Sequence, residues 1–526
     1  MIAALAVQDA VPDAVLVASV VVYIGACSLL FVFGTNLLAF SVRVWRRGIV
    51  REPVVAPWSI TDADLPPVTV QVPVYNELYV SERIIDAVAR FDYPADLLQI
   101  QVLDDSNDET SIIVADAVAR AAARGVDIVH LQRDDRTGYK AGALAAGTKQ
   151  ATGEFIAIFD ADFVPPESFL LRALSRFDAP DIAFVQTRWG HVNRNYSWLT
   201  RLQALAIDGH FLVEQSGRGE AGYWFNFNGT AGVWRAEAIE DAGGWRADTL
   251  TEDLDLSYRA HLRGWTARFA EDIVVPAEVP AQLTGFRRQQ HRWARGSLEC
   301  ASRLLPRVWR SEQPLMTKVQ ASLHLCAYFI QLLLLVLLLV YPLVLLAGEE
   351  YPQFSTLFGV GYLFALTSIA PTIFFVTGSR QGGRPWIRDL PMILAVTVFG
   401  AGLMVNTARA AVQIFTQPNP SFERTAKFGL VSEQSVQKTW TIQRYQLAPD
   451  RIVFAEIGLG TYGVVAAVLA YRFDNWGIFV YASIFSAGLF TVAIATFSHT
   501  IALYRDRQQR EQAVLAETKS LKPVSH

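Results

Sequence analysis

The sequence contains little charge and little cysteine. Only 18% of its 526 residues are Asp, Glu, Lys or Arg while 52% are hydrophobic, which excludes an ordinary soluble protein. The net charge of −4 excludes a strongly basic surface, so we expect no nucleic-acid partner. Cys27, Cys300 and Cys326 are too scattered for a disulfide framework or a zinc site. The low charged content and the high hydrophobic content favour a membrane protein.

Long apolar runs account for the hydrophobic excess. Four runs contain no charged residue and are long enough to cross about 30 Å of hydrocarbon as helices. A fifth run, Ile452–Tyr471, contains only Glu456, near its start, and we count it as a span. The four uncharged runs are Ala14–Val42, Val319–Ala347, Ser355–Ser379 and Trp476–Leu503.

The charges that flank the first run predict its orientation. Arg43 and Arg47 follow it, so its C-terminal end is cytoplasmic by the positive-inside tendency. The acidic residues Asp9 and Asp13 before it argue against a cleaved signal peptide. We therefore expect a multi-pass protein of the plasma or inner membrane in which residues 45–318 are cytosolic.

Leu390–Phe415 is an ambiguous apolar segment, because Arg409 lies near its end. A full crossing would place the following basic residues, such as Arg424 and Arg451, on the outer side. We predict five full spans and one interfacial or re-entrant helix, and six spans with an external tail remain the alternative. The predicted organisation is an anchor (1–44), a cytosolic domain with interfacial helices (45–318), two spans (319–377), the interfacial helix and a basic loop (378–451), two spans (452–504) and a cytosolic tail (505–526).

The cytosolic block alternates between β-rich and helical runs, which predicts an α/β domain with a mostly parallel sheet. The predicted strands are Val68–Val72, Leu98–Leu103, Ile128–Leu131 and Phe155–Phe159, and the predicted helices are Tyr79–Arg90, Glu109–Ala123 and Lys140–Gln150.

Polar residues follow three of these strands. They are Tyr75–Glu77, Asp104–Ser106 and Asp160–Asp162. Ligands of parallel sheets bind beyond the carboxyl ends of the strands, so these three corners form the candidate site.

Asp160 and Asp162 are candidate metal ligands. Residues i and i+2 of an extended chain point to the same side, and two carboxylates there suit Mg²⁺ or Mn²⁺ bound with the phosphates of a nucleotide. A turn in which one Asp caps the next element is the alternative.

Two further clusters complete the set. The acidic corner Thr251–Asp253 is typical of a helix cap, but a carboxylate beside a bound sugar also acts as a general base. Gln289–Trp293 combines a permanent cation with an aromatic face; it suits either a bilayer anchor or a site that binds pyrophosphate and a sugar ring.

Seven motifs in this order resemble the membrane-embedded family 2 glycosyltransferases of the cellulose synthase-like group, above all the plant mannan and glucan synthase-like branch and its bacterial relatives. The motifs are Val72–Glu77, Val102–Ser106, Gly138–Leu144, Phe159–Phe163, Phe227–Arg235, Thr251–Asp255 and Gln289–Trp293.

The resemblance implies a Rossmann-like GT-A domain that inverts the anomeric carbon of a nucleotide sugar, with Asp253 as the catalytic base. It further assigns donor binding to Tyr75, Asn76, Glu77, Asp105, Lys140, Asp160, Gln289 and Arg292, metal binding to Asp162 and Asp160, and acceptor binding to Asn228, Gly229, Thr230, Glu252 and Trp293.

Phe422–Gly429 resembles the gating loop that covers the active site in processive members of the group, with Phe422, Arg424, Thr425 and Lys427 as its main residues. Ala426 stands where the family commonly has proline, which removes a constraint on the backbone. A basic loop attracted to anionic lipid is the alternative.

The leading hypothesis is processive synthesis and export of a β-linked polysaccharide, with UDP-glucose as the first-choice donor and GDP-mannose as the second. The alternative is a single transfer to a lipid, as in ceramide or polyprenyl-phosphate glycosyltransferases. A transporter or receptor that only senses nucleotide sugars is disfavoured, because Gly138–Gly142 lacks the spacing of a P-loop.

Overall fold

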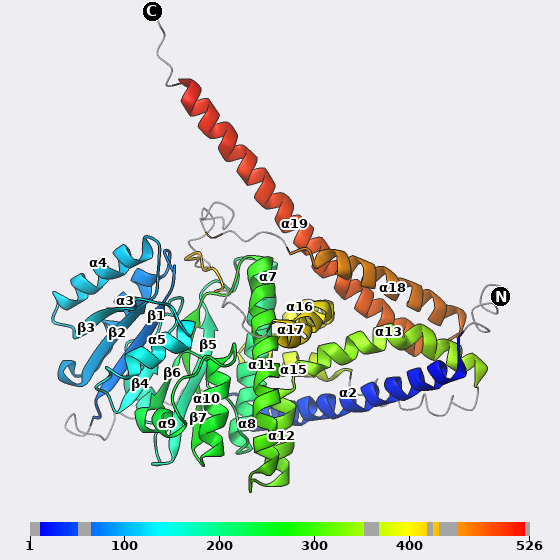
Figure 1. The fold of residues 1–526 in the computed structure, drawn as a ribbon, viewed down its shortest axis with the longest axis horizontal. Helices are drawn as coiled ribbons and strands as arrows, with labels where there is room; N and C mark the ends of the chain where they lie inside the picture. Colours follow the sequence, from blue (N-terminus) through cyan, green and yellow to red (C-terminus); the bar gives the residue numbers. More distant parts are fainter. Residues whose placement is uncertain are drawn as a thin grey trace, which may run out of the picture.

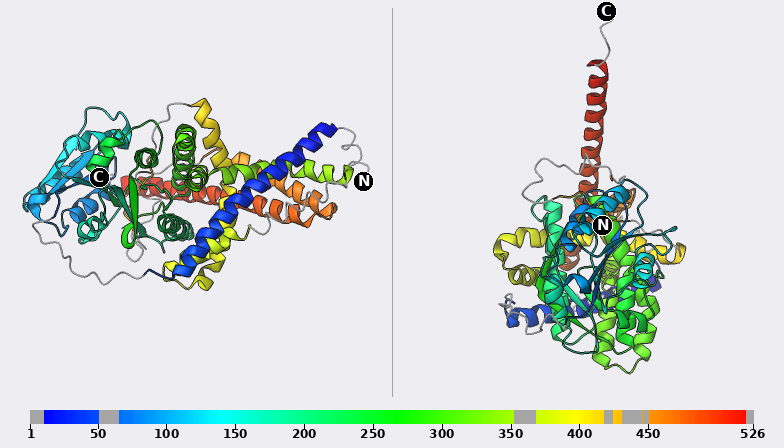
Figure 2. Two further views of the ribbon diagram at one scale, coloured as in Figure 1. Left: turned by 90° about the horizontal axis from the view of Figure 1, so that it is seen from below. Right: turned by 90° about the vertical axis from the view of Figure 1, so that its left-hand side faces the viewer.

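The computed structural model describes residues 11–50, 65–351, 368–417, 424–430, 445 and 450–520. A domain built on one sheet lies at one end of the molecule, and long apolar helices extend from it (Figure 1; two further views in Figure 2). The expected α/β domain between membrane-type helices is therefore confirmed.

The sheet has seven strands in the order β3-β2-β1-β4-β6-β5-β7. β1, β2, β3 and β4 are mutually parallel, β5 is parallel to β7, and β6 runs antiparallel to both of its neighbours. The strands are β1 (Val68–Val74), β2 (Leu98–Asp104), β3 (Ile128–Gln132), β4 (Phe155–Ile158), β5 (Ile182–His191), β6 (Gly232–Arg235) and β7 (Thr266–Ala277).

Helices cover both faces of this sheet, and β4 contributes apolar side chains to both of them. On one face, alternate valines of β1 pack against α3, α4 and α6, whereas α5, α9 and α10 pack on the other face. The domain helices are α3 (Ser81–Val88), η2 (Ala95–Leu97), α4 (Thr110–Ala122), α5 (Tyr139–Thr148), α6 (Phe169–Leu174), α7 (Trp198–Gly209), the π-helix η3 (His210–Gln215), α8 (Ser216–Glu220), α9 (Ala236–Asp241) and α10 (Glu252–Leu262).

The four strands and three helices predicted from the sequence are all present, with ends that differ by one or two residues. β5, β6 and β7 were not predicted. Phe163 forms an isolated antiparallel bridge with Ala277, so the corner after β4 lies beside the end of β7.

Two helices join the domain to the apolar part of the molecule. α11 (Leu283–Arg310) carries the Gln289–Trp293 motif, and α12 (Leu315–Leu325) follows it. The remaining helices are α2 (Asp13–Arg47), α13 (Phe329–Glu350), α15 (Ala370–Gln381), α16 (Trp386–Gly402), α17 (Met404–Thr416), α18 (Val453–Arg472) and α19 (Trp476–Ser520).

Within the described residues, five helical stretches are long and apolar enough to cross a membrane: α2, α13, Trp386–Thr416, α18 and the first part of α19. The predicted run Ser355–Ser379 lies mostly outside the described residues, and α15 covers its end.

The predicted span Val319–Ala347 begins too early. Its first residues belong to α12, which packs against α10 and α11 through a 2.8 Å hydrogen bond between Tyr258 Oη and His324 Nδ1 and a 2.9 Å hydrogen bond that Ser297 Oγ donates to Leu325 O. The membrane-type helix starts only at Phe329. The prediction placed the start too early because an apolar run alone does not distinguish a helix packed on protein from one in lipid.

Trp386–Thr416 qualifies as a span by length and composition, yet it breaks at Leu403 into α16 and α17. Both pieces are seen nearly end-on in Figure 1, where α2, α13 and α18 run across the view. His291 Nε2 and Gln413 Oε1 are 2.6 Å apart, so α17 is tied to α11 at the base of the domain. This arrangement favours an interfacial position for Trp386–Thr416. That the sheet domain lies on the cytosolic side of the membrane stays a prediction.

We predict that both ends of Trp386–Thr416 face the same side of the membrane. Single Arg388→Cys and Phe415→Cys variants should react with an impermeant maleimide in the same population of sealed vesicles, inside-out or right-side-out. The unmodified protein is the control, because Cys27 and Cys300 are buried and Cys326 is half-buried. Labelling of the two variants from opposite sides would establish a full crossing.

Candidate active site

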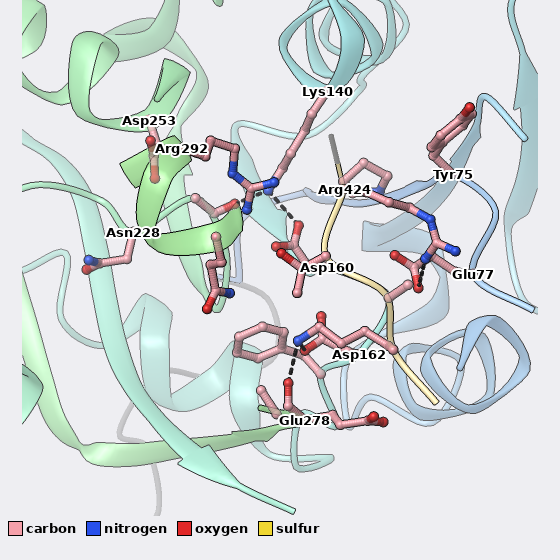
Figure 3. Close-up of a pocket in the computed structure, with 18 of the residues that line it drawn as sticks. Tyr75, Glu77, Lys140, Asp160, Asp162, Asn228, Asp253, Glu278, Arg292 and Arg424 are labelled. Atoms are coloured by element: carbon pink, nitrogen blue, oxygen red, sulfur yellow. Dashed lines mark hydrogen bonds and ion pairs between the residues drawn. The ribbon is translucent and has the colours of Figure 1, made fainter. Parts of the chain in front are cut away.

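A cleft opens at the carboxyl edge of the sheet. Its walls are the corners after β1, β2 and β4, the start of α10, one face of α11 and the segment 424–430 (Figure 3). β6 runs in the opposite direction, so the residues before it reach the same edge.

Most of the site residues predicted from the sequence meet in this cleft. Asn76 and Thr230 do not line it, and Phe422 lies outside the described residues. Asn76 bonds with Ser106 and Asn107, and Thr230 Oγ1 accepts a 2.8 Å hydrogen bond from Asp160 N. The predicted residues that line the cleft are Tyr75, Glu77, Asp105, Lys140, Asp160, Asp162, Asn228, Gly229, Glu252, Asp253, Gln289, Arg292, Trp293, Arg424, Thr425 and Lys427.

Aromatic and charged groups form the end of the cleft near β1 and β3. The Arg136 guanidinium lies 3.2 Å from the centroid of the Tyr75 ring, and Arg133 Nε donates a 2.9 Å hydrogen bond to Asp105 Oδ1. Flat rings and a fixed carboxylate suit the recognition of a nucleotide base.

Two lysines neutralise the carboxylates after β4. Lys140 Nζ lies 2.5 Å from Asp160 Oδ1, and Lys427 Nζ lies 2.6 Å from Asp162 Oδ2. Burial alone would lower the pKa of Lys140, but Asp160 and Glu252 raise it, so the cation is retained.

Asp160 and Asp162 therefore already hold cations through their carboxylate oxygens, and hard oxygen ligands of this kind fit Mg²⁺ or Mn²⁺. No cluster of three or more His, Cys, Asp or Glu side chains suited to a metal occurs among the described residues. The remaining ligands would have to come from the phosphates of a bound nucleotide.

Asp253 lies in the first turn of α10. Its Oδ1 accepts a 2.9 Å hydrogen bond from Leu254 N, and burial together with the neighbouring Glu252 raises its pKa, against the opposing effect of Lys140. A carboxylate with a raised pKa is a suitable general base near neutral pH.

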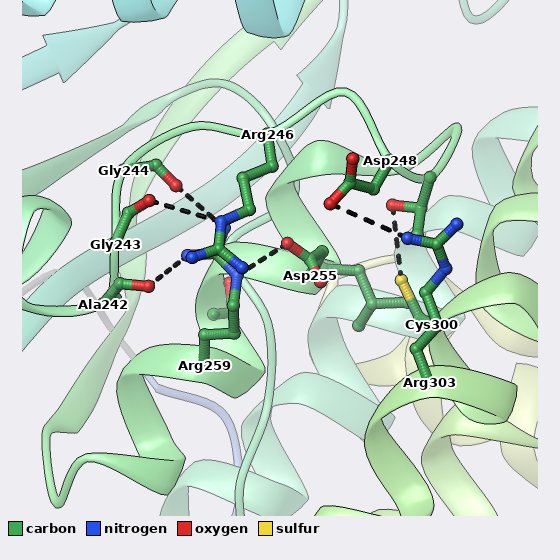
Figure 4. Close-up of polar contacts among 12 residues, drawn as sticks. Ala242, Gly243, Gly244, Arg246, Asp248, Asp255, Arg259, Cys300 and Arg303 are labelled. Carbon is green, nitrogen blue, oxygen red and sulfur yellow. Dashed lines mark hydrogen bonds and ion pairs between the residues drawn. The ribbon is translucent and has the colours of Figure 1, made fainter.

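The loop before Asp253 is held from both sides (Figure 4). Arg259 Nε donates a 2.7 Å hydrogen bond to Asp255, and the same guanidinium donates to the carbonyl oxygens of Ala242 and Gly244. From α11, Glu299 Oε2 accepts a 3.0 Å hydrogen bond from Leu250 N. The loop is therefore clamped between α10 and α11, which fixes the start of α10.

α11 brings Gln289, Arg292 and Trp293 to the cleft. Burial lowers the pKa of Arg292, against the opposing effect of Glu252, Asp160 and Asp253. On the other side of α11, Arg287 Nη2 lies 2.6 Å from Glu456 of α18, and both side chains are almost fully buried.

Arg136, Trp189, His191 and Glu278 also line the cleft, although the sequence reasoning missed them. Trp189 and His191 end β5, and Glu278 directly follows β7. Ligands of such sheets bind at the carboxyl ends of strands, so Trp189, His191 and Glu278 would have been predicted as site residues if β5 and β7 had been predicted.

Residues 66–296 match the family model described as glycosyltransferase like family 2. The chain is 41% identical to glucomannan 4-beta-mannosyltransferase 2 of Arabidopsis thaliana over 267 residues, which are 50% of each chain. It is 34% identical to probable glucomannan 4-beta-mannosyltransferase 15 of the same plant, over 65% of this chain and 66% of that one. The chain spans about half the length of the first of these curated relatives.

A solved structure with a similar chain is the mannosyltransferase PcManGT from Pyrobaculum calidifontis in complex with GDP-Man and Mn²⁺. The two chains are 22% identical, with a TM-score of 0.46, over 77% of this chain and 99% of that one.

We predict that Gly229→Ala disables the site. Gly229 has a φ of +82°, and a Cβ there would lie 2.9 Å from Asp253 Oδ2, so the carboxylate would have to move. The transfer rate should fall roughly 100-fold. Gly222→Ala is the matched control, because Gly222 has a φ of +68° but no atom within 4 Å of its Cβ position. Equal activity of the two variants would contradict the role given to this contact.

The raised pKa of Asp253 predicts the pH dependence of the reaction. A base works only when deprotonated, so kcat/KM should fall as the pH drops through this pKa, at a pH clearly above the ordinary aspartate value of about 3.9. Donor binding measured over the same pH range separates loss of catalysis from loss of binding. A kcat/KM that stays constant down to about pH 5 would contradict the assignment.

Proposed function

Residues 66–296 are a family 2 glycosyltransferase domain, and from this we propose that the protein is a membrane-bound, inverting β-glycosyltransferase of polysaccharide synthesis. The cleft on this domain binds a nucleotide sugar, and the apolar helices hold the domain at a bilayer. The acceptor is the growing end of a β-linked polysaccharide.

One observation carries the proposal: the acidic corners Asp160–Asp162 and Glu252–Asp253 share one cleft with the cations Lys140 and Arg292. A transferase needs a base for the acceptor and positive charge for the leaving diphosphate within the same space. A protein that only senses nucleotide sugars has no need of a general base such as the half-buried Asp253.

The chemistry is a single displacement at the anomeric carbon. The acceptor hydroxyl attacks this carbon, its proton passes to Asp253, and the bond between the anomeric carbon and the diphosphate breaks. Arg292 and Lys140 stabilise the negative charge that develops on the diphosphate, and Trp293 supports the acceptor sugar with its flat face. The α-linked donor thus gives a β-linked product.

Asp160 and Asp162 would hold Mg²⁺ or Mn²⁺, which supplies further positive charge to the diphosphate when bound. Glu77 and Asp105 lie at the nucleotide end of the cleft. Burial raises the pKa of Glu77 to about 8, although Arg424 lowers it.

The names of the curated relatives support mannose as the transferred sugar and give no support to UDP-glucose, the first choice from the sequence. We therefore propose GDP-mannose as the donor. The buried segment 424–430, which lines the cleft, favours repeated transfer to one polymer over a single transfer to a lipid.

The proposal predicts nucleoside diphosphate release with a clear donor preference. Purified protein should release GDP from GDP-mannose roughly tenfold or more faster than UDP from UDP-glucose or UDP-N-acetylglucosamine. Asp253→Asn is the control: it should retain donor binding, because the side chain keeps its shape, and lose turnover.

The product formed from radiolabelled donor distinguishes polymer synthesis from a single transfer to a lipid. Material that stays at the origin on chromatography and resists organic extraction supports polymer synthesis. A single organic-soluble product would refute it, and release of no nucleoside diphosphate from any donor would refute the transferase itself.

A further inference from the structure

The segment Arg424–Leu430 forms part of the cleft wall, although it is far from the other cleft residues in the sequence. Arg424 Nη1 lies 3.0 Å from Glu77 Oε2, and Lys427 Nζ lies 2.6 Å from Asp162 Oδ2 (Figure 3 shows Arg424 beside Glu77). Three apolar side chains anchor the segment in a small buried cluster with Ala281: Ala426, Phe428 and Leu430.

Glu278 forms the seat of this segment. Its side chain is buried, and its two carboxylate oxygens accept hydrogen bonds of 2.8 Å from Phe428 N and 3.1 Å from Leu430 N. Lys427 Nζ also donates a hydrogen bond to the backbone oxygen of Glu278. The bridge between Phe163, in the corner after β4, and Ala277 at the end of β7 places Glu278 beside Asp162, so the seat and the candidate metal ligand are neighbours.

The ammonium group of Lys427 occupies the same carboxylate that is a candidate ligand for a divalent cation. Side-chain exposure is only 10% for each of Lys427 and Asp162, so water screens their pair poorly. A divalent ion bound to the free oxygen of Asp162 would place like charges within about 5 Å of each other in this buried setting, which is strongly unfavourable.

Building on the function proposed above, we propose that Lys427 is an internal cation that occupies Asp162 while the segment is seated, and that Glu278 is the positioning residue that keeps it there. Binding of Mg²⁺ or Mn²⁺ at Asp162 requires Lys427 to leave the carboxylate. The position of the segment thus depends on whether metal and donor are bound. The Asp162 carboxylate holds either the ammonium group of Lys427 or the metal that comes with the donor.

The test measures binding of Mn²⁺ alone to the purified full-length protein in detergent, with free Mn²⁺ followed by electron paramagnetic resonance. Lys427→Met should bind Mn²⁺ roughly tenfold more tightly than the unmodified protein, because a charge-assisted hydrogen bond no longer competes. Lys427→Arg keeps the cation and should stay close to the unmodified protein. Lys149→Met is the matched control, since Lys149 is exposed.

The variant Glu278→Gln distinguishes release of the segment from the effect of losing a negative charge near Asp162. Loss of a negative charge near Asp162 would by itself weaken Mn²⁺ binding. An amide accepts through only one oxygen, so the variant also loosens the seat, and we expect tighter Mn²⁺ binding. Glu240→Gln, at an exposed position, is the control for the substitution.

Leu430→Pro provides a second route to the same result. It removes one N–H group that Glu278 binds, changes no charge and leaves the sheet domain intact, so it should also tighten Mn²⁺ binding. Thermal unfolding of each variant confirms that it is folded.

Tighter Mn²⁺ binding in Lys427→Met together with Glu278→Gln or Leu430→Pro supports the exchange of cations. Unchanged or weaker binding in folded Glu278→Gln and Leu430→Pro would overturn it. Because no donor is present, this outcome is independent of the proposed function: a protein that passes the test yet releases no nucleoside diphosphate keeps the exchange and loses the transferase.

Discussion

The crowding of acidic side chains at the carboxyl edge of the sheet is the constraint on which the site depends. Glu77, Asp160, Asp162 and Asp253 converge there, Asp162 buried and the other three half-buried, and acidic groups this close together require nearby cations. The sheet strands themselves supply none of the paired cations: these come from α5, α11 and the segment 424–430. Charge compensation therefore draws together parts of the chain that the sheet alone would leave apart.

α11 connects the cleft to the long apolar helices. One side of the helix presents Arg292 and Trp293 to the cleft. On its other side Arg287 pairs with Glu456 of α18 and donates a 2.9 Å hydrogen bond to Thr496 of α19. A buried ion pair of this kind is costly to form and costly to break, so loss of either partner alone would destabilise the contact between these helices.

The first half of the sheet and its polar corners were predictable because both signals are local. Alternate valines mark β1, and the polar residues directly after β1, β2 and β4 mark the edge. β5 and β7 pair across about 80 residues of sequence, with two irregularities in register, and no local pattern encodes such a pairing. Trp189, His191 and Glu278 were missed with them. The contact between Lys427 and Asp162 spans 265 positions and follows only from the fold. The misplaced start of α13 has a similar cause, because hydrophobicity alone does not reveal that α12 packs on protein.

The ion pair between Arg287 and Glu456 has a mechanical consequence for the enzyme. A thicker or thinner bilayer tilts the helices that cross it. Since α18 is bonded to α11 by charges that lie out of reach of water, such a tilt is passed to the helix that carries Arg292. Under the function proposed above, the lipid or detergent around the purified protein bears on the geometry of the cleft, and it is as much a variable of the preparation as salt or temperature.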